Sequence, residues 1–334
     1  MVNRISLRKT ESAHHLVKSL ILETLLPIVL GVTYLGFALA EPRFHSTANI
    51  INLLKQSSYL VMLATAQMVV LITRGFDLSV GPVISMISVG SSLVMVAVLK
   101  GDPNAVSLAI LAGWLTGLGM GLAVGAVNGF AVAFLRVNPF VTTLGMMGIG
   151  LGFASTLSGG TPVYEVPEAL MDMFSRGSWV GIPVPVAVCA FVLGGIYVLL
   201  NHTVLGRSLY ILGSNERAAH VAGLSVRLHL GFAYVICSVI VAIVALMLTA
   251  RTGSGEPRLG IALMLDSLMA AIIGGVALSG GEGRILHCIL GGLFVTMLSN
   301  GMNLVRVNGY IQMMILGSVL IGAIYAGRFR GQIR

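Results

Sequence analysis

The chain has few charged residues: Asp, Glu, Lys and Arg make up 10% of its 334 residues, whereas soluble domains average roughly 25%. Its mean hydropathy is +0.96, and 56% of its residues are hydrophobic. This balance excludes an ordinary soluble domain. The 42 glycines fit membrane helices that approach one another closely. The composition therefore predicts an all-α integral membrane protein.

Other absences narrow the function. The three cysteines, Cys189, Cys237 and Cys288, lie in apolar stretches without Cys-x-x-Cys spacing, which favours small buried side chains over a disulfide or metal site. The seven histidines form no metal-ligand pattern. The basic residues form no stripe interleaved with aromatic residues, so nucleic-acid binding is not expected. No lysine follows a glycine, so the chain has no Gly-x-x-x-x-Gly-Lys-[Ser/Thr] phosphate loop.

Long apolar stretches are what the sequence has instead. A membrane span needs about 20 mostly apolar residues, and ten segments of the chain meet this requirement. They lie near residues 20–40, 53–73, 78–99, 105–134, 140–158, 180–200, 228–250, 263–279, 285–305 and 310–327. The 105–134 stretch is long and glycine-rich, which suggests a tilted or broken helix. The 263–279 stretch is short, carries Asp266 and is typical of a half-helix that lines a cavity.

Basic residues set the orientation of these spans. With the N-terminus in the cytoplasm, thirteen of the twenty Lys and Arg residues fall inside and seven outside. We therefore expect about ten transmembrane helices with both termini cytoplasmic. The expected organisation is a cytoplasmic segment at 1–19, a transmembrane domain at 20–327 with a cytoplasmic loop at 201–227, and a cytoplasmic tail at 328–334.

Two segments of the chain resemble each other. Asn128 precedes Arg136-Val137-Asn138-Pro139-Phe140, and Asn300 precedes Arg306-Val307-Asn308-Gly309-Tyr310. The two arginines are 170 residues, or five spans, apart. An odd number of spans inverts the second copy, so one interpretation is a 5+5 inverted repeat of the kind found in transporters. Chance similarity between glycine-rich spans is the other interpretation.

An acidic residue interrupts the apolar pattern between Ile72 and Gly81, where Asp77 stands beside Gly75 and Ser79. A carboxylate at bilayer depth costs several kcal/mol, and chains that keep one there usually line a polar path or a break between helices. The protein is therefore a candidate for moving a polar solute across a membrane.

The segment 206–224 predicts a short helix in a cytoplasmic loop. Ser214 or Asn215 can cap its start, Glu216 falls in its first turn, and Gly223 suits its end. Such a helix is either an ordinary surface helix between spans or a docking element for a cytoplasmic partner.

Several motifs together resemble the permease subunits of bacterial ATP-binding-cassette importers for ribose, xylose, autoinducer-2 and related compounds. The matching segments, which fall in the family's order within about residues 50–325, are Phe76–Gly81, Asn138–Gly145, Gly206–Arg207, Gly213–Ala219 and Gly274–Gly283. Two residues depart from the family pattern: Arg74 stands where relatives commonly have a small residue, and Phe76 replaces the usual Ile.

The resemblance implies the protein's partners. The segment at Gly213, Asn215, Glu216, Arg217, Ala218 and Ala219 would be the coupling helix that seats in a cytoplasmic ATPase. ATP would bind to that partner, and this chain would carry no cofactor and no catalytic site. A periplasmic binding protein would deliver a small hydrophilic solute, such as a monosaccharide or polyol, and a second permease subunit would complete the assembly. The location would be the bacterial inner membrane.

Polar residues within the spans are candidates for the substrate pathway, because amides and hydroxyls can replace a sugar's hydration without the cost of a full charge. The candidates are Asp77, Ser79, Asn128, Thr142, Thr143, Asp266, Asn300 and Asn303, with Gln67 and Gln312 as further members. Uncharged polar residues also commonly bond between helices, which is the alternative explanation for most of them.

Other functions remain open at this point. An amino-acid or nucleoside permease of the same superfamily is one. A proton-coupled secondary transporter with Asp77 or Asp266 as its proton site is another. A membrane transferase is disfavoured, because metal-diphosphate chemistry needs clustered carboxylates and the close acidic pair Glu165 and Glu168 does not have that spacing.

Overall fold

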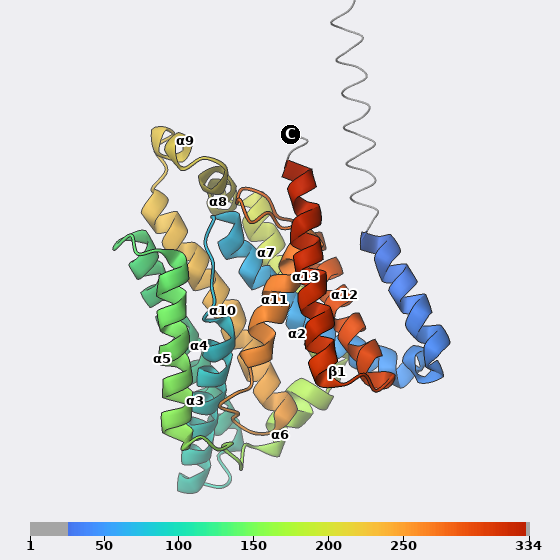
Figure 1. Ribbon diagram of the computed structural model, residues 1–334. Helices are drawn as coiled ribbons and strands as arrows, with labels where there is room; N and C mark the ends of the chain where they lie inside the picture. The colour runs from blue at the N-terminus through green and yellow to red at the C-terminus, as the bar shows by residue number, and fades with distance from the viewer. Residues whose placement is uncertain (1–25, 332–334) are drawn as a thin grey trace, which may run out of the picture.

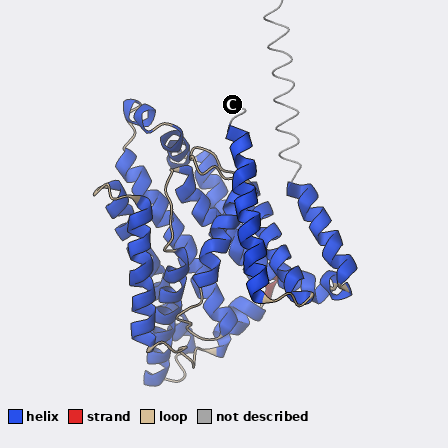
Figure 2. Cartoon of the chain, in the orientation of Figure 1, coloured by secondary structure: helices blue, strands red, loops and turns tan. Residues whose placement is uncertain are grey.

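The computed structural model describes residues 26–331 as a bundle of helices (Figure 1). The described residues form helices joined by loops, together with one short hairpin of β1 (Ser178–Trp179) and β2 (Ile182–Pro183) (Figure 2). The longer helices are Leu26–Ala40, α2 (Thr47–Ile72), α3 (Val80–Gly101), α4 (Val106–Ala133), α5 (Pro139–Ser158), α7 (Val184–His202), α8 (Val204–Ser214), α10 (Val226–Thr252), α11 (Ile261–Gly274), α12 (Ile285–Leu304) and α13 (Gly309–Gly331). The shorter elements are η1 (Pro42–His45), α6 (Glu168–Met171), η2 (Asp172–Arg176) and α9 (Glu216–Val221).

A helix lies at every predicted span, although the bounds differ. Among the described residues, six helices are long and apolar enough to cross a membrane, namely α3, α4, α5, α7, α10 and α12. The all-α, multi-pass prediction is therefore confirmed. The count of ten spans, the inverted repeat and the cytoplasmic termini remain predictions. The first predicted span, 20–40, begins outside the described residues. The predicted segment 1–19 lies wholly outside them.

Three local expectations need correction. The 105–134 stretch was predicted to be a tilted or a broken helix, and the break is wrong because α4 runs unbroken from Val106 to Ala133, whereas the tilt stays a prediction. The short 263–279 stretch does form a short helix, but α11 ends at Gly274 because Gly275 adopts a left-handed φ of 108°. The span predicted at 180–200 begins later, at Val184, because the β1–β2 hairpin occupies residues 178–183.

The core of the bundle is built around α2 and α10, which pack against each other. All residues of α2 from Ser57 to Ile72 are buried, including the polar Thr65 and Gln67. Helix α2 also packs against α11 and α12, and α10 packs against α3 and α4. A helix that is buried all round carries few outward polar residues, so α2 cannot be recognised from an amphipathic stripe.

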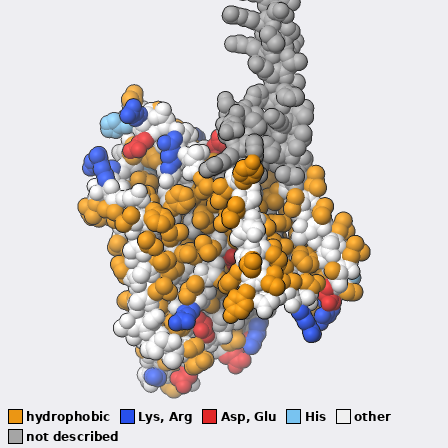
Figure 3. Space-filling model, viewed as in Figure 1, with side chains coloured by type: hydrophobic (Ala, Val, Ile, Leu, Met, Phe, Trp, Pro, Cys, Tyr) orange, Lys and Arg blue, Asp and Glu red, His pale blue; other side chains and the backbone are white. Residues whose placement is uncertain are grey.

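The outer surface is apolar. Helices α4, α5, α7 and α13 expose large side chains such as Leu111, Leu115, Phe153, Phe191 and Met313. Hydrophobic side chains cover much of the visible face in Figure 3, while charged ones gather toward the two ends of the bundle. This distribution is that of a protein surrounded by lipid, since exposed apolar area of this extent is unfavourable in water.

The two ends of the bundle carry different elements. In Figure 1, α8, α9 and the C-terminal end of α13 lie at one end, and α6 and β1 lie at the other. We refer to these as the α9 end and the α6 end.

Candidate functional site

The break between α2 and α3 forms the centre of the candidate site. Helix α2 ends at Ile72, Arg74 adopts a left-handed φ of 64°, and the chain runs without helix to Val80. Inside this stretch the carboxylate of Asp77 accepts two hydrogen bonds through Oδ1, from the Ser79 N–H at 2.8 Å and from the Ser79 hydroxyl at 2.5 Å. The acidic side chain thus holds the turn that leads into α3.

Side chains from three helices hold this turn in the interior. Gln67 of α2 donates to the Asp77 carbonyl oxygen at 2.9 Å, and Asn128 of α4 donates to the Ser79 hydroxyl at 3.1 Å. The Cys237 thiol of α10 lies 3.8 Å from Asp77 Oδ2, the oxygen that does not bind Ser79. The Asp77 side chain makes no ion pair within the described part of the chain, and the residue is 2% exposed.

Burial of an unpaired carboxylate is costly unless hydrogen bonds offset it. Asp77 has such bonds, but two neighbouring acceptors do not: Gln67 Oε1 and Asn128 Oδ1 are buried without a partner. A buried unsatisfied acceptor costs on the order of 1–3 kcal/mol. The break is therefore a polar cluster with unused acceptor capacity inside an apolar bundle.

The starts of α3 and α11 meet beside this cluster. A Cβ on Gly81 would collide with the carbonyl oxygen of Gly260, and a Cβ on Gly260 would collide with the carbonyl oxygen of Gly81. The Gly260 N–H also donates to the Ser85 hydroxyl at 3.1 Å. Two helix starts thus approach each other with backbone against backbone, which only glycine permits.

A cavity of about 510 Å³ lies between the break and α5. Its lining comprises Arg74, Phe76, Leu78, Asn138, Pro139, Phe140 and Leu268. Of the predicted pathway residues, Thr142 and Thr143 are near this lining in sequence. Thr143 is buried and donates to the Pro139 carbonyl at 2.9 Å, whereas the buried hydroxyl of Thr142 has no partner.

The remaining predicted pathway residues lie in other places. Asn300 is buried and exchanges hydrogen bonds with Asn49 of α2, at 3.0 Å and 3.1 Å. Asn303 is exposed and accepts from Gln312 at 2.9 Å. Asp266 is half-buried on α11. The structure thus brings Gln67, Asp77, Ser79 and Asn128 together but leaves the other predicted residues outside this cluster.

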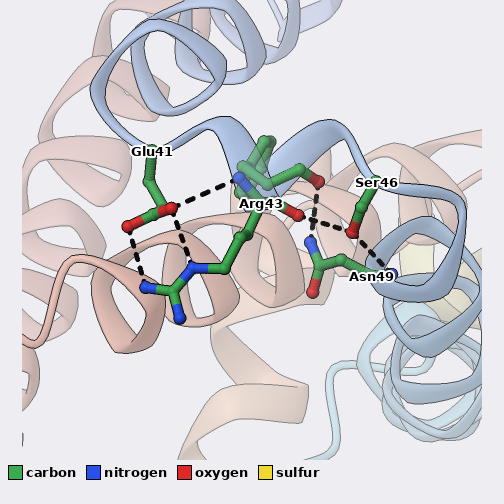
Figure 4. A network of polar contacts seen from close by, with 5 residues as sticks. Glu41, Arg43, Ser46 and Asn49 are labelled. Atoms are coloured by element: carbon green, nitrogen blue, oxygen red, sulfur yellow. Dashed lines mark hydrogen bonds and ion pairs between the residues drawn. The ribbon is translucent and has the colours of Figure 1, made fainter.

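Asn49, the partner of Asn300, belongs to a corner at the α6 end, whose polar contacts with Ser46 and the 41–44 segment are drawn in Figure 4. There Ser46 caps α2 by accepting from the Asn49 N–H at 3.3 Å, and Asn49 donates to the Phe44 carbonyl at 2.8 Å. Arg43 pairs with Glu41 at 2.9 Å, and this hydrogen bond lowers the pKa of the Glu41 carboxyl to about 2. The corner therefore keeps its charges at any physiological pH.

The loop expected to hold one short helix contains two. The Asn215 side chain accepts from the Ala218 N–H at 3.1 Å, which starts α9 as the capping pattern predicts, and Gly223 has the left-handed φ of 76° expected after its end. The helix α8 before it was not predicted. Glu216 and Arg217 are exposed, whereas Gly213 and Ala219 are buried beneath them.

Two site residues escaped the sequence analysis. Cys237 was interpreted as a small buried apolar residue, and Tyr234, whose hydroxyl donates to the Phe76 carbonyl at 3.3 Å, was not singled out. Both stand in an apolar stretch of α10, and nothing in the local pattern separates them from packing residues. Only the approach of α10 to the break reveals their position.

A mainly helical bundle with an apolar outer surface, two helix starts in backbone contact and an exposed short helix, α9, has the architecture of a multi-pass membrane protein. The chain belongs to the family described as the permease component of branched-chain amino acid transport systems, whose model matches residues 49–324. This membership confirms the resemblance drawn from the motifs.

Curated relatives match most of the chain. The ribose import permease RbsC of Escherichia coli K12 is 34% identical over 288 residues, which cover 85% of this chain and 87% of that protein. The D-allose transport permease AlsC of the same strain is 32% identical, with coverage of 87% and 86%. The galactose/methyl galactoside import permease MglC of Salmonella typhimurium is 31% identical, with coverage of 89% and 91%.

Proposed function

We propose that this chain is the membrane-spanning permease subunit of an ATP-binding-cassette importer for a monosaccharide or a closely related polyol. The observation that carries the proposal is that relatives named for ribose, allose and galactose match this chain over more than four-fifths of its length. The buried polar break and the exposed helix α9 suit this role, because one can contribute to a path and the other can receive a cytoplasmic partner.

The partners follow from the same proposal. A separate ATPase supplies the nucleotide site, since this chain has no phosphate loop. A periplasmic binding protein delivers the solute, a second permease subunit completes the assembly, and the complex sits in the bacterial inner membrane. Selection by the binding protein leaves the permease with weak polar contacts, which the hydroxyl and amide side chains of the predicted pathway can provide.

We further propose the 5+5 inverted repeat, pairing α2 with α10, α3 with α11, α4 with α12 and α5 with α13. The packing supports it: α4 packs against α10 as α12 packs against α2, and α3 packs against α5 as α11 packs against α13. The reciprocal contact of Gly81 with Gly260 is what a two-fold relation between α3 and α11 requires.

The corners after α4 and α12 support the repeat in finer detail. Arg136 and Arg306 have left-handed φ values of 58° and 59°. The side chains of Asn138 and Asn308 each accept from the N–H two residues later at 2.9 Å. The similarity seen in sequence thus corresponds to the same local geometry, which favours duplication over chance.

Ten spans with a cytoplasmic α9 end predict opposite accessibility for two engineered cysteines. Ser225→Cys, after α9, is expected to react with a membrane-impermeant maleimide only in inverted vesicles, and Thr161→Cys, after α5, only in intact spheroplasts. The native cysteines are all buried, so the unmodified chain serves as the unlabelled control. Labelling of both sites from the same side would contradict this topology.

The proposed function is tested by purification and reconstitution. Mild detergent extraction from the native host is expected to recover an ATPase chain with the permease. Vesicles containing both chains and the binding protein are expected to take up ribose, allose or galactose only with ATP. Recovery of the permease alone, together with uptake that a proton-gradient uncoupler abolishes, would instead indicate the secondary transporter.

Exposed residues of α9 give a sharper prediction. Glu216→Ala and Arg217→Ala are expected to reduce ATP-driven uptake about tenfold or more, the effect of losing one well-placed interface residue. The permease itself should stay folded, because both side chains are exposed. Arg227→Ala, an exposed arginine at the start of α10, is the control of matched charge. Unchanged uptake in both α9 variants would rule out the docking role.

The family description favours one second candidate, a branched-chain amino acid permease. The same vesicles discriminate the two. Uptake of leucine, isoleucine or valine, without uptake of the three sugars, would replace the sugar proposal.

A further inference from the structure

Three segments that are far apart in sequence meet at the α9 end of the bundle. They are the end of α2 at Ile72–Arg74, the end of α8 at Tyr210–Ser214, and the glycine-rich loop between α11 and α12 at Gly280–Gly283. We call this meeting point the three-way junction. Along the chain it adjoins both the exposed helix α9, which begins two residues after Ser214, and the break that contains Asp77, which follows Arg74.

Three hydrogen bonds, one between each pair of segments, join the junction. The Gly281 N–H donates to the Ile72 carbonyl at 2.8 Å. The Tyr210 hydroxyl donates to the Gly283 carbonyl at 2.7 Å. The Arg74 guanidinium donates to the Ser214 carbonyl at 2.8 Å.

The junction is also closely packed. A Cβ on Gly213 would collide with the Ile72 carbonyl oxygen and come within 2.7 Å of the Gly281 nitrogen. A Cβ on Gly281 would collide with the Ser214 hydroxyl. Backbones at such short separations move together, because there is no space in which one segment can shift alone.

Arg74 is the only side chain among these three bonds that reaches from the break side toward α9. Its acceptor, the Ser214 carbonyl, belongs to the last residue of α8, where a helix leaves carbonyls unpaired and carries partial negative charge. The next residue, Asn215, caps α9. The guanidinium is therefore bound at the point where α8 passes into α9.

The backbone conformation of Arg74 also indicates that its side chain has a role. Its left-handed φ of 64° is a conformation that glycine adopts without cost and that other residues rarely adopt. If only the turn mattered, glycine would serve better. The side chain, three residues before Asp77, is what the arginine adds.

We propose that Arg74 is a positioning residue. Its bond to Ser214 connects the end of α8, where α9 begins, to the break that contains Asp77, so that a displacement of α9 by its partner moves the break. This inference rests on the proposed function for the identity of that partner. It goes beyond docking, because it assigns the route by which docking reaches the interior.

The test compares Arg74→Gly with Arg136→Gly. Both replacements remove one exposed arginine from a left-handed position at a helix end, where glycine keeps the backbone. Arg136 stands on the α4–α5 corner, and in the described part of the chain its side chain makes no hydrogen bond to the three-way junction. In vesicles with the ATPase and the binding protein, ATP hydrolysis and sugar uptake are measured together. Arg74→Gly is expected to lower the uptake per ATP hydrolysed about tenfold, as the loss of one charged hydrogen bond allows. Arg136→Gly should leave this ratio unchanged.

Partial recovery of the ratio in Arg74→Lys, which keeps a donor of shorter reach, would support the positioning role. Equal ratios in both glycine variants would overturn it. A proportional fall of hydrolysis and uptake in Arg74→Gly would also overturn it, since this would indicate a general loss of assembly.

Hydrogen–deuterium exchange of the permease alone tests the inference even if the proposed ATPase partner is wrong. Arg74→Gly is expected to raise exchange at both Asn215–Ala219 and Phe76–Ser79, and Arg136→Gly at neither. Faster exchange in only one of the two segments would mean that Arg74 does not connect them.

Discussion

Valine at Gly81 or at Gly260 is expected to abolish the stable permease. In each case the new Cβ would collide with a carbonyl oxygen on the facing helix start, and a backbone atom cannot rotate away as a side chain can. Overpacking of a core costs about 1–3 kcal/mol when side chains can adjust, so we expect a loss of at least about 3 kcal/mol here. The measurement is the yield and melting temperature of monodisperse protein after mild detergent extraction.

Gly145→Ala provides the matched control for this experiment. Gly145 lies within α5, and a Cβ there meets no atom within 4 Å. Alanine favours a helix interior over glycine by about 0.5–1 kcal/mol, so this variant should be as stable as the parent chain or slightly more stable. Normal yield and melting temperature in either valine variant would show that α3 and α11 do not meet in this way.

The second large effect is expected at Asp77. Replacement by alanine removes the acceptor of two buried hydrogen bonds from Ser79, and the Ser79 N–H then has no acceptor within the turn. A buried donor left unsatisfied costs about 1–3 kcal/mol. We expect Asp77→Ala to lower the melting temperature clearly and to abolish sugar uptake, because the turn that positions α3 is lost.

Asp77→Asn separates the geometry from the charge. Its amide oxygen can still accept from the Ser79 N–H, so the melting temperature should stay close to that of the parent chain. Uptake by this variant then reports on the charge: a raised KM with unchanged kcat would indicate contact with the solute. If Asp77→Ala is as stable as the parent chain, the carboxylate does not hold the break.

The sequence predicted the local features best. The Asn215 cap and Gly223 depend on chemistry within one helical turn, and both appear as expected. Asp77 was recognised because a carboxylate is rare among apolar residues. Helix α8 was missed, since its residues Val204–Ser214 contain two glycines and follow α7 after a single non-helical residue.

Contacts between residues that are far apart in the sequence could not be predicted. The recurrence of Asn128 and Asn300 suggested equivalent roles, yet one bonds Ser79 in the break and the other bonds Asn49 at the α6 end. Their helices meet different neighbours, which a repeat in the sequence cannot specify. The contact of Gly81 with Gly260 likewise joins positions 179 residues apart. Gly81 belongs to the Phe76–Gly81 motif, but nothing in the sequence marks Gly260 among the 42 glycines as its partner.

The twin corners at Arg136 and Arg306 bear on how such a chain is assembled in the bilayer. In each corner the bonds close within a few residues: Val137 donates to the Ala131 carbonyl at 3.1 Å, and Val307 donates to the Met302 carbonyl at 2.9 Å. A corner closed by its own backbone needs no support from the rest of the bundle. The α4–α5 and α12–α13 pairs can therefore enter the membrane as preformed helical hairpins, before the interior cluster around Asp77 exists.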